Sequence, residues 1–166
     1  MENKRKIQIM AFSILSILSI NVIPGFGQIK TNKEFENKTL VENQFSLWKA
    51  GKGTLFDLLS DHVEWTVAGT SPISGTFNSK KEFMEKSVAP ISARLSKQIV
   101  PALESIITSG DDVIVEWHGE ATAIDGKAYS NTYSWHLTLA DGRIVKARAF
   151  LDTYILNDLI ERITIK

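Results

Sequence analysis

The spacing of hydrophobic residues divides the N-terminal half of the chain into helices and one strand. From Asn32 to Lys49 apolar side chains fall mostly at helical spacing, with charged residues between them. Gly51-Lys52-Gly53 ends this helix, and Thr54 is placed to cap a short second helix that ends near Leu58. Two helices are therefore expected before the first strand.

From Asp61 the hydrophobic period changes to two, which is typical of a half-buried strand. Val63, Trp65 and Val67 share one face of it, and polar residues alternate with them on the other. Turn residues follow from Gly69 to Thr76 on both sides of a single isoleucine. This pattern predicts a hairpin or a loop at a rim, where it would cover a pocket.

A third helix and a second long strand are expected next. Ser79 and Glu82 have the spacing of a capping box, and Pro90 is expected to kink or end the helix that they open. The residues from Ser96 to Thr108 are rich in β-branched side chains and predict a strand. Pro101 restricts this strand to an edge or a bulge.

The last third of the chain predicts a three-stranded meander. Three extended runs cover Asp112–Ile124, Lys127–Leu139 and Arg143–Leu156, and an Asp-Gly pair joins each to the next. Asp-Gly between two extended runs is a strong signal for a two-residue hairpin. Strands that follow a group of helices indicate an α+β domain, with the helices on one face of the sheet.

The first 27 residues have the order of a signal peptide. Lys4, Arg5 and Lys6 precede an apolar stretch, and Gly25 and Gly27 provide the small side chains that a signal peptidase requires. We expect cleavage before Gln28, an exported (periplasmic or secreted) protein, and a single domain over residues 28–166. The alternative is an uncleaved anchor helix, which the serines inside the stretch disfavour. No membrane association is expected after removal of the signal.

Composition narrows the classes of partner and cofactor. Lys plus Arg and Asp plus Glu both total 19, so the formal charge is zero and the basic stripe of a nucleic-acid binder is missing. The chain has no cysteine, which excludes disulfides, thiolate metal ligands and a cysteine nucleophile. Histidine pairs with metal-ligand spacing, phosphate loops and dinucleotide motifs are missing as well. We therefore predict neither a metal nor a cofactor.

Several short motifs of the predicted domain occur in a familiar order. They are Val63-Glu64-Trp65, Gly69-Thr70-Ser71-Pro72-Ile73-Ser74-Gly75, Tyr129-Ser130-Asn131-Thr132-Tyr133, Asp141-Gly142-Arg143-Ile144 and Arg148-Ala149-Phe150-Leu151-Asp152-Thr153. Together they resemble the SnoaL-like branch of the nuclear transport factor two-like superfamily, which includes ketosteroid isomerases, scytalone dehydratase and limonene-epoxide hydrolase. The resemblance covers nearly the whole of residues 28–166.

The resemblance implies a fold and a set of partners. The fold is a cone-shaped α+β barrel, in which a curved antiparallel sheet of about five to six strands packs on three N-terminal helices around one pocket. A small apolar molecule would occupy the pocket, and a homodimer would form on the outer face of the last three strands. Two departures reduce the polar chemistry, because Ala149 replaces the usual acidic residue of the terminal motif and Phe150 the usual tyrosine.

Asp152 is the first candidate for a catalytic group. A carboxylate held in an apolar cone would have a raised pKa and would exchange protons near neutral pH. The alternative is structural, because an Asp-Thr pair at a strand end also accepts hydrogen bonds from nearby backbone or pairs with Arg148. Both interpretations stay open at the level of sequence.

Tyr133 and Asn131 lie two residues apart, on the same face as Trp135, and would orient a ligand carbonyl or hydroxyl by hydrogen bonding. A tyrosine that fills core volume is the alternative. The pocket wall is expected to include Trp65, Trp117, Trp135, Arg148 and Phe150, although core packing also explains the first two tryptophans.

Glu116, His118 and Glu120 alternate along one strand opposite Val115 and Trp117. Such a row forms an acid–base relay or part of a metal site if it faces a pocket. Because Val115 and Trp117 are expected to point inward, the row should instead face solvent or a partner subunit. A β-bulge would reverse this phase.

Three functions remain for the pocket. One is a cofactor-independent isomerase, hydratase or hydrolase that uses Asp152, Tyr133 and Asn131. Another is an exported module that binds a small molecule without chemistry, which the two departures favour. The third is a dimerisation scaffold whose cone is filled with side chains.

Overall fold

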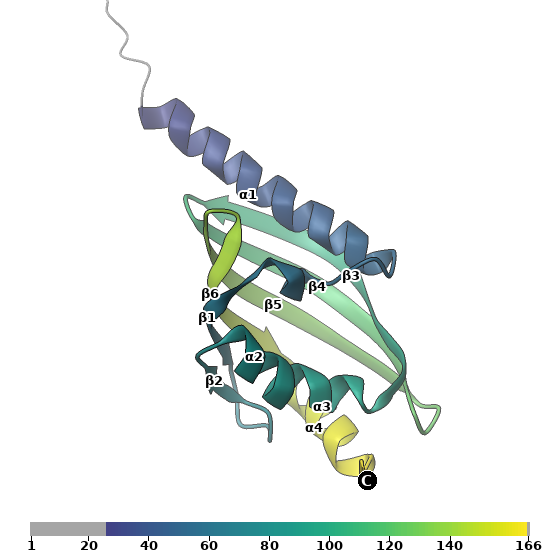
Figure 1. The fold of residues 1–166 in the computed structure, drawn as a ribbon. Coiled ribbons are helices and arrows are strands. Elements are labelled where there is room, and N and C mark those ends of the chain that lie inside the picture. The colour runs from purple at the N-terminus through teal and green to yellow at the C-terminus, as the bar shows by residue number, and fades with distance from the viewer. Residues whose placement is uncertain (1–25, 166) are drawn as a thin grey trace, which may run out of the picture.

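The computed structural model describes residues 26–165, and the expected signal sequence lies almost entirely outside them. Six strands form one curved sheet, and the helices α1 and α2–α3 lie over the same face of it (Figure 1). The elements in chain order are α1 Phe26–Lys49, η1 Leu55–Leu58, β1 Leu59–Val67, β2 Gly75–Phe77, α2 Lys80–Phe83, η2 Met84–Val88, α3 Ala89–Ser92, β3 Leu95–Ser109, β4 Asp112–Ala123, β5 Ala128–Ala140, β6 Arg143–Leu151 and α4 Thr153–Arg162.

The sheet is mixed, which corrects the expected all-antiparallel arrangement. Its strand order is β2-β1-β6-β5-β4-β3, and the β1–β6 pair is parallel while all other neighbours are antiparallel. β1 is separated from β6 in the chain by the helices and the meander, and such a long connection allows two strands to run in the same direction. The predicted cone with an α+β architecture is confirmed, and its sheet has two open edges.

Hairpins form at both Asp-Gly pairs of the meander, but the two-residue turn is confirmed only at the second, because Ala123 bonds to Lys127 and leaves three residues in the β4–β5 loop. In the β5–β6 turn, Asp141 and Gly142 both have positive φ angles, of 50° and 71°. This is the backbone conformation that a two-residue turn requires, and Asp and Gly adopt it at low cost. Pro101 lies on β3, which is an edge strand, as its missing N–H requires.

Helix α1 is fixed to the turn between β3 and β4 by polar contacts. Asn37 donates from its side-chain amide to the carbonyl of Gly110 at 3.2 Å, and the Gly110 N–H donates to Glu34 at 2.8 Å. Lys33 forms an ion pair with Asp111 in the same turn. The described helix begins at Phe26, six residues before the expected start at Asn32.

The second helical segment changes its winding in the middle. Ser79 accepts a hydrogen bond from the Glu82 N–H at 3.1 Å, which confirms the predicted cap. A five-residue π-helix, η2, joins α2 to α3 without a break, and Pro90, which has no N–H to donate to the preceding turn, follows it near the start of α3. The irregularity expected at Pro90 thus lies in the turn before it.

The C-terminus contains the clearest error of the sequence analysis. The expected strand to Leu156 ends at Leu151, and α4 follows it. Asp152 caps this helix, since its side chain accepts from the N–H groups of Tyr154 at 2.9 Å and Ile155 at 3.3 Å. Leu156 and Leu159 are fully buried on its inner side, so packing fixes α4 against the end of the sheet.

Candidate functional site

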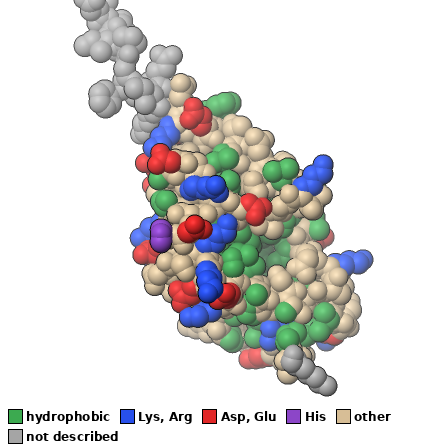
Figure 2. Space-filling view, in the orientation of Figure 1, with side chains coloured by type: hydrophobic (Ala, Val, Ile, Leu, Met, Phe, Trp, Pro, Cys, Tyr) green, Lys and Arg blue, Asp and Glu red, His purple; other side chains and the backbone are tan. Residues whose placement is uncertain are grey.

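One cavity of about 280 Å³ lies between the concave face of the sheet and the helices. Its inner lining residues are buried, whereas Trp48, Phe56, Met84 and Ile91 at its outer end are only partly so. Figure 2 shows hydrophobic side chains inside a hollow between α1 and the α2–α3 segment. The volume is near the lower end of the range of small-molecule sites, roughly 300 to 1,000 Å³.

Packed aromatic rings build the sheet wall of the cavity. Trp117 of β4 stacks on Tyr133 of β5, with ring centroids 3.9 Å apart and an angle of 7° between the planes. Trp135 meets Trp65 and Trp117 edge to face, at 5.2 Å and 4.8 Å. Alternation along each strand places these side chains inward, because the valines of β4 and the leucines of β5 that are in phase with them are also buried. The wall is therefore rigid and apolar.

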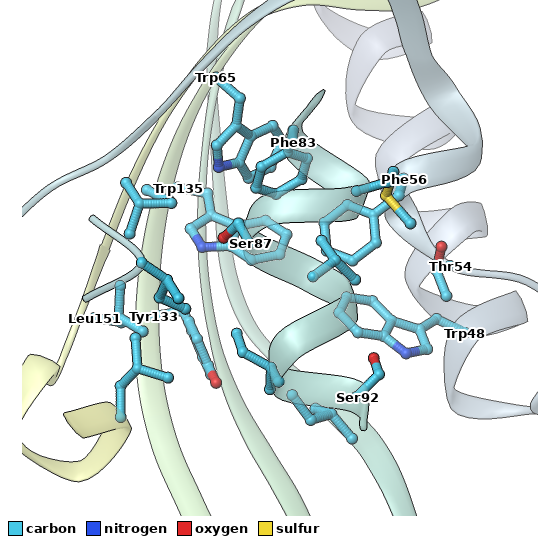
Figure 3. Close-up of a pocket in the computed structure, with 18 of the residues that line it drawn as sticks. Trp48, Thr54, Phe56, Trp65, Phe83, Ser87, Ser92, Tyr133, Trp135 and Leu151 are labelled. Atoms are coloured by element: carbon cyan, nitrogen blue, oxygen red, sulfur yellow. The ribbon is translucent and has the colours of Figure 1, made fainter. Parts of the chain in front are cut away.

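The opposite wall comes from η1 and the α2–α3 segment. Phe83 of α2 stacks on Trp65 with centroids 4.4 Å apart, and Phe56 of η1 lies against both Phe83 and Trp135 (Figure 3). The π-helix brings Ser87 to the cavity, where its side chain is 3% exposed. Ser87 was not expected in the site, because no pattern in the sequence predicted that this turn is a π-helix, which is wider than an α-helical turn.

Gly119 makes room for the stacked pair. A Cβ at this position would lie 2.9 Å from Trp117 Cζ3, 2.9 Å from Ile99 Cγ2 and 3.1 Å from Tyr133 Cε2. Cβ contacts below 3.0 Å are essentially never found in proteins, and 3.1 Å is tighter than nearly all of them. A glycine is therefore needed here for packing, since it lies in a regular strand and not in a turn.

A buried hydrogen-bond chain begins behind the stacked pair. The Tyr129 and Tyr133 hydroxyls are 3.1 Å apart, and the Asn131 amide donates to the Tyr129 hydroxyl at 3.3 Å. The same amide donates to the Asp152 carbonyl at 2.9 Å and accepts from the Asp152 N–H at 3.0 Å. Asn131 does not line the cavity, so its contact with the site runs through the two tyrosines.

The two phenols keep their protons at neutral pH. Burial raises the pKa of Tyr133 well above its ordinary value of 10.0, and the neighbouring Tyr129 raises it further. Burial also raises the pKa of Tyr129, which its hydrogen bonds to Tyr133 and Asn131 partly oppose. Tyr133 is therefore protonated near pH 7 and is not a general base there.

Asp152 lies outside the cavity, contrary to the expectation of a carboxylate inside an apolar cone. Its side chain is exposed and caps α4, while only its backbone contacts Asn131. The chain turns from β6 into α4 at this residue, and the cap directs the carboxylate toward the helix N–H groups. The position of Asp152 therefore agrees with the structural interpretation, in which its side chain accepts hydrogen bonds from nearby backbone. The ion pair with Arg148, which was the other structural possibility, is not among the salt bridges of the described residues.

The structure separates the expected pocket wall into two faces. Trp65, Trp117 and Trp135 line the cavity. Arg148 and Phe150 do not, because the alternation of β6 points them outward and places Ala149 inward. Trp117 and Trp135 are turned inward, at 1% and 4% exposure, so they contribute nothing to the outer face on which a homodimer was expected.

The row of Glu116, His118 and Glu120 faces outward, as expected from the phase of the strand. His118 Nε2 lies 2.9 Å from the Ser130 hydroxyl and 3.9 Å from Glu120, both on the outer face. The β4–β5 pairing has no register shift that would reverse the phase. Within residues 26–165 no cluster of three or more His, Asp or Glu side chains has the arrangement of a metal site.

Comparisons with known proteins agree with this geometry. The family model of the SnoaL-like domain matches residues 41–147, which is more than half of the chain. The chain belongs to the SnoaL-like domain family. No protein with a curated description matches this SnoaL-like chain. Within its described part, no helix is both long and apolar enough to cross a bilayer.

Solved structures share the fold of this SnoaL-like domain at low sequence identity. An NTF2-like protein of unknown function from Burkholderia pseudomallei is 19% identical, with a TM-score of 0.62 over 75% of this chain and 96% of its own. A candidate SnoaL-like polyketide cyclase from Jannaschia is 16% identical, with a TM-score of 0.62 over 80% and 96%. TerC, co-crystallised with polyporic acid, is 21% identical, with a TM-score of 0.61 over 75% and 98%. At these identities the likeness shows the fold.

Proposed function

We propose that this SnoaL-like protein is an exported binding module that holds a small, largely apolar molecule in its cavity and leaves it chemically unchanged. The observation that carries the proposal is the lining. Aromatic and aliphatic side chains dominate it, and it includes no Asp, Glu, His, Lys or Arg. Such a surface stabilises an apolar ligand through burial, and its aromatic rings add large contact areas.

The alternative, an acid–base enzyme, lacks a group to move protons. Asp152 is on the protein surface, and Tyr133 holds its proton well above neutral pH. General acid–base catalysis needs a group that is within reach of the reacting atom and has a pKa near the working pH. Two of the solved structures with a similar fold are a candidate polyketide cyclase and a candidate isomerase. Turnover by this chain should therefore be tested as well.

The structure of TerC with polyporic acid supports a ligand-binding role for a protein of this fold. The mouth of the cavity in this chain lies between two helical segments, where a small molecule has access from solvent. A dimerisation scaffold would need no such opening. The binding module is therefore favoured over the scaffold.

The decisive experiment is a native mass spectrum of the protein purified from its own cells, compared with Asp152→Asn. Asparagine keeps the helix cap and removes only the carboxylate. We expect both proteins to retain the same molecule. A substrate on the variant and a different product on the wild type would establish an enzyme, and a ligand on neither protein would favour the scaffold.

Export is proposed from the order of charged, apolar and small residues in positions 1–27. The same mass spectrum tests it, because the cleaved chain begins at Gln28. Intact protein that starts at Met1 and stays in the cytoplasmic fraction would contradict export.

A homodimer is proposed on the outer face of β4, β5 and β6. Phe150 is 42% exposed there, and its ring centroid lies 5.3 Å from that of His136. An exposed aromatic side chain on an open sheet face is a frequent anchor of protein interfaces.

A further inference from the structure

The outer face of the sheet carries charged side chains in two rows that lie on different strands. β4 contributes an acidic row, Asp112, Glu116 and Glu120, and contains no Lys or Arg. β6 contributes a basic row, Lys146 and Arg148, and contains no Asp or Glu. All five residues are exposed, because they alternate with the buried residues of the concave side.

β5 lies between the two rows and separates them. It contains no Asp, Glu, Lys or Arg, and its outward side chains are mostly hydroxyl groups, together with His136. Strands two places apart in a sheet lie about 10 Å from each other. The Debye length is about 8 Å at physiological ionic strength, so the two rows do little to neutralise each other within one chain.

One charge in each row has no ionic partner within the chain. Glu116 and Arg148 occur in none of the ion pairs of residues 26–165. The neighbour of Arg148 on β5 is His136, which offers no negative charge. Lys146, by contrast, pairs with Glu64 of β1 at 2.8 Å. Glu116 and Arg148 are therefore available to a partner from outside the chain.

Apolar side chains lie on the same face as the charged rows. Phe150 is 42% exposed, and Ile107 of the edge strand β3 is 60% exposed. Ile107 pairs directly with Ile114 of β4, so both point to the outer side. An apolar patch bordered by charged residues has the composition of a protein interface.

The separation of charge decides which orientation of a second copy fits this face. Two identical faces stack about a two-fold axis that lies between them, in the plane of the sheets. An axis parallel to β5 sets β4 of one copy over β6 of the other, so opposite charges meet. An axis across the strands sets β4 over β4 and β6 over β6, and the like charges that then meet disfavour association.

We propose that a second copy of this chain binds the outer face about a two-fold axis along β5, so that the acidic row of each copy meets the basic row of the other. The register of the sheet pairs Ile114 with His136 and His136 with Arg148. Arg148 of one copy then lies between Asp112 and Glu116 of its partner. This rests on the homodimer proposed above and adds its orientation and the charges that determine it.

The test reverses one charge in each row and then mixes the two variants. Glu116→Lys and Arg148→Glu should each weaken the dimer at least tenfold, because like charges meet twice across the two-fold axis. In a heterodimer of the two variants, one contact joins the new lysine to the new glutamate and the other keeps the original pair. An equimolar mixture should therefore dimerise almost as tightly as the wild type.

Sedimentation equilibrium measures the affinities, and an affinity tag on one variant identifies the heterodimer in a native mass spectrum. Raising NaCl from about 0.05 to 0.5 M should weaken the wild-type dimer and strengthen the homodimer of either variant, because salt screens attraction and repulsion alike. Lys81→Glu and Glu85→Lys are matched controls, since this exposed pair lies on the helical segment and its reversals change the net charge equally. Both should dimerise like the wild type.

The outcomes separate the orientation from the homodimer itself. A wild-type monomer at micromolar concentration overturns the homodimer and the orientation together. A wild-type dimer that neither reversal weakens, or two weakened variants that do not recover on mixing, overturns the orientation and leaves the homodimer. The binding function of the cavity is decided independently, by the native mass spectrum for a retained ligand.

Discussion

Gly119 shows how one residue shapes the cavity wall. It carries no side chain at a position where a Cβ would press on Trp117, Tyr133 and Ile99 at 2.9 to 3.1 Å. The stacked rings occupy that space and hold the Tyr133 hydroxyl beside Tyr129. The missing side chain of Gly119 thus leaves the space that the stacked rings of Trp117 and Tyr133 need.

We predict that Gly119→Ala destabilises the fold by about 1 to 3 kcal/mol, because the added methyl forces the stacked rings or the backbone to move. Ser134→Ala, on the neighbouring strand, should change stability by less than about 0.5 kcal/mol. Urea denaturation monitored by tryptophan fluorescence measures both. A Gly119→Ala protein as stable as the wild type would show that the wall is loosely packed.

We predict that the protein loses stability in alkali because Tyr129 and Tyr133 are buried. Their pKa values are raised in the folded state, so the full contribution is present below the unfolded value of about 10 and is lost as the pH rises through the folded values. The free energy of unfolding should therefore fall from about pH 10 upward. The double variant Tyr129→Phe, Tyr133→Phe should fall less steeply, while Tyr154→Phe should follow the wild type. Identical curves for wild type and double variant would contradict the raised values.

At the scale of elements, the sequence predicted the three strands of the meander correctly, but it did not predict the helix that follows β6. Asp-Gly pairs and the period of two defined β4, β5 and β6, since turn chemistry and alternation are local properties. Helix α4 was missed, although Asp152 is a helix-capping residue and Leu156 and Leu159 have helical spacing. The apolar run was continuous across Leu151, and a continuous run does not distinguish a strand from a buried helix.

The site could be predicted only where local alternation decides it. Trp65, Trp117, Trp135 and Tyr133 were expected on the inner face and lie there. Arg148 and Phe150 were expected in the pocket wall and lie on the outer face, because the alternation of β6 turns Ala149 inward. Ser87 and Phe56 depend on how the helical segments pack over the sheet, which no local pattern encodes.

The cap of α4 gives a prediction at this scale. Asp152→Ala should destabilise the protein by about 1 kcal/mol, because two helix N–H groups lose their acceptor, whereas Asp152→Asn should be nearly neutral. Thermal denaturation compares the two variants. If Asp152→Asn loses the ligand without a change in stability, the carboxylate has a functional role.

At the scale of the whole molecule, the sheet separates two surfaces with different chemistry. Its concave side holds the aromatic cavity, and its outer side carries polar residues together with Phe150. The alternation of β4, β5 and β6 produces both surfaces from the same strands. Substitutions on one side should therefore leave the other side functional.

We predict that the protein is a dimer at micromolar concentration and that Phe150→Glu weakens the dimer at least tenfold, by placing a charge in the contact. Tyr154→Ser, which alters an exposed aromatic residue of α4, should leave it unchanged. Light scattering coupled to gel filtration measures both. A wild-type monomer would end the proposal of this interface.

A substitution that fills the cavity shows whether a ligand binds there. Ala149 is buried at 3% exposure and lines the cavity, so Ala149→Leu should fill part of the space and keep or raise the stability of the free protein. The measurement is the melting temperature of both proteins with and without an organic extract of the cells that make the protein. We expect the extract to raise the melting temperature of the wild type alone, because a ligand stabilises only the state that binds it. An equal rise in both proteins, or none in the wild type, would contradict a ligand in this cavity.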